Sequence, residues 1–127
     1  PRLIVCQGDA ADLSRILSES ESGNVDLVVS GIPFSTMRPS VAKALVADIH
    51  RSLAPDGQFV TYQVRDTIIE IATELFHTPR VSLVFWNVPP LRLYQFAKPC
   101  REKQHAHPVC SAMDAVAITT SFEGRQD

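Results

Sequence analysis

A short stretch over residues 24–39, NVDLVVSGIPFSTMRP, constrains the fold of this chain more than any other part of the sequence. Val25–Val29 is a brief apolar run that stops at Ser30-Gly31, as is typical of a buried strand in a parallel sheet. Pro33 removes a backbone donor from the loop, and Pro39 stands where a following helix would begin. The stretch therefore predicts a strand, an open polar loop and a helix, an arrangement in which α/β proteins bind ligands.

The remaining sequence alternates strand-like and helix-like segments. Apolar residues recur every three or four positions over Pro39–Leu53, which predicts the clearest helix of the chain. The other expected elements are a strand at Leu3–Cys6, a helix at Leu13–Ser20, a strand at Gln58–Val64, a helix from Asp66 or Thr67 to Phe76, and strands at Arg80–Val88 and Leu91–Lys98. Ala54–Gly57 is expected to be a turn, and Met113–Phe122 is compatible with one more strand or helix. This order predicts an α/β three-layer sandwich with an antiparallel terminal hairpin.

The bulk properties restrict the class of protein. With 127 residues, 45% of them apolar, the chain is long enough for one domain with a buried core. With a net charge of −2, the chain lacks the excess of positive charge that non-specific binding of nucleic acid requires. No apolar run reaches the roughly 18 to 20 residues of a membrane span, and no signal peptide opens the sequence. Together with an odd count of cysteines, three, these features favour the cytoplasm.

Four short motifs follow one another in a suggestive order. They are Gly8-Asp9-Ala10, the run Asp26–Pro33, the turn Leu53–Phe59 and the segment Trp86–Pro90. In this order they resemble the later portion of class I S-adenosylmethionine-dependent methyltransferases, and most of all the bacterial phospholipid N-methyltransferases. The resemblance covers Arg2 to Lys98. It implies a partial Rossmann-like methyltransferase fold that lacks the first two strands.

The resemblance also implies a cofactor, S-adenosylmethionine, and roles for two loops. Gly8, Asp9 and Ala10 would bind the cofactor, with the Asp9 carboxylate accepting a hydrogen bond from the adenine amine. A loop or capping role for Asp9 is the competing interpretation. The catalytic loop would lie beside the transferable methyl group and orient the acceptor nitrogen, because methyl transfer depends mainly on positioning. Its residues are Ser30, Gly31, Ile32, Pro33 and Phe34.

The same loop bears on the acceptor. Related adenine-N6 and protein-amine methyltransferases carry [N/D]-x-P-[Y/F] here, whereas this chain has Gly31 at the polar position. The resemblance therefore favours an ethanolamine phospholipid as the methyl acceptor, with its headgroup as a partner. The basic side chains between residues 92 and 103 are interpreted either as a solvated face or as a contact to such a phosphate headgroup.

One family feature is missing. The superfamily binds the methionine end of the cofactor through a glycine-rich loop after its first strand, and none of the five glycines here lies in such a loop. We therefore expect a truncated or divergent enzyme that is weak or inactive as this chain. The alternative is a non-catalytic, self-associating domain that kept the fold and lost the cofactor site.

The missing strands also leave one side of Val25–Val29 unpaired, which makes it an association site unless it is covered. The covering element is the Leu3–Cys6 strand, the tail after Pro99, or a second copy of the chain. We expect a rearranged sheet and a homodimer. The chain is divided into a methyltransferase-like domain, 1–98, and a divergent extension, 99–127, for which covering a sheet edge is one role considered.

Two further groups of side chains have ordinary interpretations. The spacing C-x4-H-x-H-x2-C matches no known zinc module, so a polar linker with free thiols and no metal is predicted for Cys100, His105, His107 and Cys110. Tyr62, Trp86 and Tyr94 are expected on strands as core or cross-strand residues, with a lipid or acceptor contact as the lesser alternative.

Overall fold

The computed structural model of the chain describes residues 5–20, 23–99 and 115–118. Its strands are β1 (Val25–Ser30), β2 (Leu53–Gln63), β3 (Arg80–Val84), β4 (Leu91–Ala97) and β5 (Ala115–Ile118). Its helices are α1 (Leu13–Glu19), α2 (Pro39–Ser52) and α3 (Thr67–Ala72), with short 3-10 helices η1 (Ala10–Asp12) and η2 (Phe34–Thr36).

The predicted elements between residues 13 and 98 are all present, but two are shorter than predicted. The α3 helix ends at Ala72 rather than Phe76, because the following residues fold back in turns in which Leu75 N and Phe76 N both donate to Ala72 O. Strand β3 ends at Val84 rather than Val88, since the residues after it form the connection to β4.

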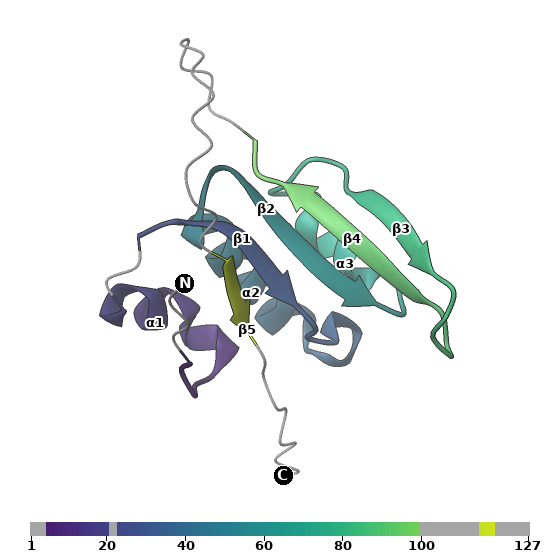
Figure 1. Cartoon of the computed structure of the whole chain (residues 1–127), viewed down its shortest axis with the longest axis horizontal. Coiled ribbons are helices and arrows are strands. Elements are labelled where there is room, and N and C mark those ends of the chain that lie inside the picture. Colours follow the sequence, from purple (N-terminus) through teal and green to yellow (C-terminus); the bar gives the residue numbers. More distant parts are fainter. Residues whose placement is uncertain (1–4, 21–22, 100–114, 119–127) are drawn as a thin grey trace.

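The sheet has the strand order β3-β4-β2-β1-β5 (Figure 1). Strand β1 runs parallel to both of its neighbours, β2 and β5, whereas β4 runs antiparallel to β2 and to β3. The predicted antiparallel terminal hairpin is therefore confirmed as β3 and β4, with β4 inserted between β2 and β3.

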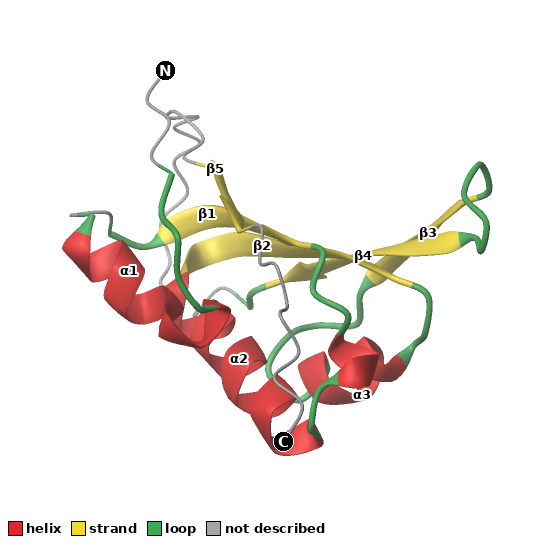
Figure 2. Cartoon of the chain, turned by 90° about the horizontal axis from the view of Figure 1, so that it is seen from below, coloured by secondary structure: helices red, strands yellow, loops and turns green. Residues whose placement is uncertain are grey.

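The three helices lie together on one face of the sheet (Figure 2). The connections β1–α2–β2 and β2–α3–β3 both advance in the same direction across the sheet. Right-handed connections that advance in one direction place their helices on one face. The α/β class is confirmed, but the described residues form two layers rather than the predicted three-layer sandwich.

The side of β1 that the sequence leaves unpaired is covered by β5. Leu27 pairs with Ala115 and Ser30 with Ile118 in a parallel ladder, so part of the tail after Pro99 occupies this edge. Val5 and Cys6, the described half of the predicted Leu3–Cys6 strand, are not in a strand. The predicted homodimer rested on a free β1 edge and loses that support.

The core between the sheet and α2 is built largely of aromatic rings. Phe59 on β2 stacks against Phe96 on β4 at a centroid distance of 5.8 Å, and Phe76 lies 5.9 Å from Phe59. Phe34 meets Phe59 edge to face at 6.3 Å. Because Phe34 follows the loop after β1, this contact anchors the end of that loop to the core.

The predicted Ala54–Gly57 turn is an irregularity inside β2. Val25 pairs with Leu53 but Leu27 pairs with Gln58, so the intervening β2 residues bulge out of the ladder. Asp56 has φ of 63°, and an added Cβ on Gly57 would lie 2.8 Å from Ala54 O. The turn therefore requires a residue without a side chain at position 57.

Candidate functional site

The loop after β1 is held by its own first residue. Ser30 is buried at the end of the strand, and its Oγ accepts a hydrogen bond from Ile32 N at 3.2 Å. After Pro33, η2 begins with the buried Phe34. The five predicted catalytic residues thus form one short turn between a buried hydroxyl and a buried ring.

A glutamine on the neighbouring strand fixes the middle of the same loop. Gln63 Nε2, at the end of β2, donates to Ile32 O at 2.7 Å and to Thr61 Oγ1 at 2.8 Å. Gln63 and Thr61 are buried, and Thr61 is the ladder partner of Ser30. Hydrogen bonds in such a low-dielectric environment are strong and hold their groups in one geometry. The backbone of the loop is therefore fixed from two strands.

Gln63 contacts the candidate site, and the sequence analysis did not single it out. Phe59, Thr61 and Gln63 share one face of β2 and are all buried, as the twofold period of a strand requires. The sequence feature that could have identified Gln63 is a pair of polar residues, Thr61 and Gln63, at consecutive inward-facing positions where the strand ends. Polar groups at such positions need partners, and Ile32 O is one of them.

A second polar cluster ties the start of α3 to β4. Asp66, the residue before α3, accepts hydrogen bonds at Oδ1 from Arg92 Nη1 and from Tyr94 Oη. The hydrogen bonds from Tyr94 and Arg92 lower the pKa of Asp66, and burial together with Asp66 raises the pKa of the Tyr94 hydroxyl. At neutral pH Asp66 is anionic and Tyr94 protonated. The cluster therefore ties the start of α3 to β4.

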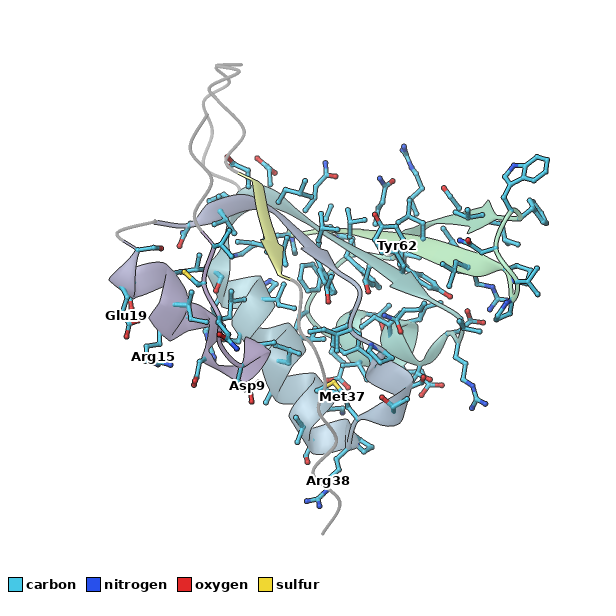
Figure 3. The ribbon with its side chains drawn as sticks, turned by 60° about the horizontal axis from the view of Figure 1, so that its bottom comes forward. Asp9, Arg15, Glu19, Met37, Arg38 and Tyr62 are labelled. Carbon is cyan, nitrogen blue, oxygen red and sulfur yellow. The ribbon has the colours of Figure 1, made fainter. Side chains whose placement is uncertain are left out.

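The predicted cofactor segment, Gly8–Ala10, leads into the 3-10 helix η1. Asp9 Oδ1 accepts from Ala11 N at 3.0 Å and so caps η1, which was the competing interpretation of this residue. Its side chain is exposed, as Figure 3 shows. Ala10 and Phe34 belong to the same buried core, but no hydrogen bond among the described residues joins Gly8–Ala10 to Ser30–Phe34.

A cavity of about 410 Å³ lies beside the loop, between η2, the start of α2, and α3. This volume is in the range of small-molecule sites. Phe34, Met37 and Ile71 contribute apolar lining, and Lys43 and Glu74 form an ion pair at 3.3 Å. In Figure 3 Arg38 extends outward, and its side chain does not line this cavity.

The part of the chain that the structure describes contains neither a cluster of potential metal ligands nor a candidate membrane span. Residues 5–20, 23–99 and 115–118 hold no group of three or more His, Cys, Asp or Glu side chains placed to bind a metal ion. Cys100, His105, His107 and Cys110 lie outside the described residues. Within the same ranges, no helix has the length and apolar character to cross a membrane.

Comparison with known proteins identifies the fold. No family model and no curated protein matches the sequence. Among solved structures, the N-methyltransferase NodS from Bradyrhizobium japonicum WM9, in complex with S-adenosyl-L-homocysteine, matches 74% of this chain and 53% of its own, at 20% identity and a TM-score of 0.58. A methyltransferase from Pyrococcus furiosus matches 68% of this chain and 55% of its own, at 15% identity and a TM-score of 0.50.

The chain thus has a methyltransferase-like α/β fold and spans about half the length of these two proteins. This confirms the fold that the four sequence motifs predicted.

Proposed function

We propose that this chain carries the acceptor side of an S-adenosylmethionine-dependent N-methyltransferase of the phospholipid type. The observation that carries the proposal is the loop Ser30–Phe34, which follows β1 at its carboxyl end and is fixed by Ser30 Oγ and by Gln63 of β2. The crevice beyond the carboxyl ends of parallel strands is where α/β folds bind their ligands. The likeness to NodS, an N-methyltransferase, supports the reaction class.

In this proposal the loop orients an amine for transfer. The Ile32 carbonyl is held by Gln63, so the adjoining backbone of Gly31 and Pro33 has little freedom, and a fixed backbone is what an in-line methyl transfer needs. Gly31 has no atom within 4 Å of the place where a Cβ would stand, which leaves room beside the loop for an acceptor. The acceptor class we propose is the amine of an ethanolamine phospholipid, because the loop lacks the polar residue of the nucleobase and protein-amine enzymes.

The residues present fit part of the cofactor. The exposed Asp9 carboxylate is able to accept from the adenine amine while it caps η1, since a carboxylate offers several acceptor positions. No glycine-rich loop for the methionine end occurs in the sequence. S-adenosylmethionine, when bound, supplies the methyl group as a sulfonium. We therefore propose that this chain by itself binds the cofactor weakly and has little or no activity.

Calorimetric titration with S-adenosyl-L-homocysteine, combined with light scattering, tests the proposal. We expect a dissociation constant of about 1 mM, which corresponds to about −4 kcal/mol. Asp9→Ser should abolish this binding and keep the cap, because serine is also a good N-cap residue. Asp12→Ser is the matched control, an exposed acid three residues further on, and should bind as the unmodified chain does.

Calorimetry and light scattering together distinguish a methyltransferase from a non-catalytic, self-associating domain. Absence of heat at millimolar ligand, with a dimeric mass, contradicts the enzyme proposal and supports a self-associating domain. Equal loss of binding in both Asp variants would contradict the role proposed for Asp9.

A further inference from the structure

The connection between β3 and β4 exposes large apolar side chains at its tip. Phe85 is 73% exposed, Trp86 98% and Val88 100%. Figure 2 shows this connection projecting beyond the body formed by the sheet and the helices. The tip is thus convex and has no neighbour among the described residues that would cover it.

This exposure corrects a prediction. Trp86 was expected on a strand as a core or cross-strand residue, but β3 ends at Val84 and the tryptophan stands in the connection. Pro89 and Pro90 follow, and because they lack backbone donors they prevent the β3–β4 ladder from continuing through them. Single exposed apolar residues are ordinary on protein surfaces, whereas a contiguous group of them marks an interaction site.

The charges around the tip indicate its partner. No charged residue occurs from Val81 to Leu91. Arg92 directly follows Leu91, the β4 residue that pairs with Val84 at the base of the tip. A second arginine, Arg65, comes two residues after Gln63, which is the ladder partner of Arg92. Asp66 neutralises Arg92, so the group of three has a net charge of about +1.

We propose that residues 85–90 insert into the interfacial region of a phospholipid bilayer. Tryptophan favours the level of the headgroups, because its ring is largely apolar and its N–H stays wet. Guanidinium groups just behind an apolar tip meet the phosphates at that level. A convex tip needs a matching groove in a protein partner, whereas a bilayer accepts it without one. The inference does not rest on methyl transfer, since it concerns adsorption to lipid and not the site at Ser30–Phe34.

Trp86 is the only tryptophan of the chain and therefore reports on its own insertion. Vesicles of phosphatidylcholine mixed with phosphatidylglycerol should shift the fluorescence emission of Trp86 to shorter wavelength. In a flotation assay the chain should rise with the same vesicles. Acyl chains brominated near the headgroup should quench the emission. The double variant Phe85→Ser with Val88→Ser keeps the reporter, and its partitioning into vesicles should fall at least tenfold.

Val41→Ser is the matched control, since Val41 is an exposed apolar residue on α2, remote from the tip in the sequence. It should float as the unmodified chain does, and both variants should keep the melting temperature because the changed side chains are exposed. Arg65→Glu should weaken binding to the anionic vesicles. Failure to float, or equal flotation of the double variant, would overturn the proposal. A blue shift that grows with protein concentration in the absence of vesicles would also overturn it, in favour of a second copy as the partner.

Discussion

Gln63 Nε2 on β2 donates to the backbone carbonyl of Ile32, which follows β1, at a distance of 2.7 Å. The two strands are neighbours and parallel, so this hydrogen bond joins the carboxyl ends of both. It fixes the loop that we propose orients the methyl acceptor.

Gln63→Leu is expected to destabilise the chain and to loosen this loop. Leucine has a similar volume but leaves the Ile32 carbonyl without this donor, and an unsatisfied buried group costs about 1–3 kcal/mol. Urea unfolding measures the loss, and hydrogen exchange at the amides of Gly31 and Ile32 measures the loosening. Gln95→Leu, a half-buried glutamine on β4, is the control. Unchanged exchange at Ile32 in Gln63→Leu would show that the loop does not depend on this contact.

Asp48 should make the stability of the chain depend on pH. Ser14 N and Ser14 Oγ both donate to the Asp48 carboxylate, and Arg51 lies 2.9 Å away. Burial acts to raise the pKa of Asp48, but the hydrogen bonds from Ser14 and Arg51 outweigh it, and the pKa is lowered from 3.8. A lowered pKa means that the contribution is complete above the unfolded-state value and is lost as the pH falls through the folded-state value.

Asp48→Asn removes this charge without changing the size of the side chain. At pH 7 we expect a loss of about 1–3 kcal/mol in unfolding free energy, since the hydrogen bonds to a charged group are replaced by weaker ones. The difference between the two chains should shrink as the pH falls below about 4. A difference that stays constant down to pH 2 would contradict the assignment to the ionised carboxylate.

Gly57→Ala should destabilise the β2 irregularity. The new Cβ would lie 2.8 Å from Ala54 O and 3.1 Å from Leu53 side-chain atoms, and the nearest of these is a backbone atom that cannot easily move. Such overpacking costs about 1–3 kcal/mol, measured by thermal or urea unfolding. Gly23→Ala is the control, because no atom lies within 4 Å of its added Cβ. Equal stability of the two variants would refute the close approach at Gly57.

Removal of the residues after Pro99 should make the chain associate. Strand β5 covers one side of β1, and without it the apolar run Val25–Val29 has an open edge. Light scattering should then report dimers or larger species for the shortened chain at concentrations where the full chain is monomeric. A monomeric shortened chain would mean that β5 contributes nothing to the protection of this edge.

Those parts of the structure that depend on local patterns were predictable from the sequence. The strand, loop and helix over residues 24–39 follow from a short apolar run, two prolines and a period of three to four, and the structure confirms them as β1, η2 and α2. The described residues form two layers where three were predicted (Figure 2), because the number of layers depends on the direction in which successive connections cross the sheet. The edge partner of β1 was left open among three possibilities, since pairing of distant segments is not a local property.

Asp9 and Gln63, the two polar residues proposed for the site, also differ in whether their contacts are local or distant in the sequence. Asp9 was found because it stands in a recognisable loop, and its capping contact to Ala11 is local. Gln63 was missed because its partner, Ile32, lies 31 residues earlier in the chain. Trp86 was misplaced because the apolar pattern of β3 continues through it, whereas the ladder stops at Val84.

The most direct test of the central claim is a ¹H–¹⁵N correlation spectrum of the chain titrated with S-adenosyl-L-homocysteine. At millimolar ligand we expect the chemical-shift changes to concentrate on the amides of Gly8–Ala10 and on those of the loop from Ser30 to Phe34, Pro33 excepted. Asp9→Ser should remove the first set. Shifts confined to other segments, or an unchanged spectrum at millimolar ligand, would contradict the proposal that these two loops form the remaining part of a methyltransferase site.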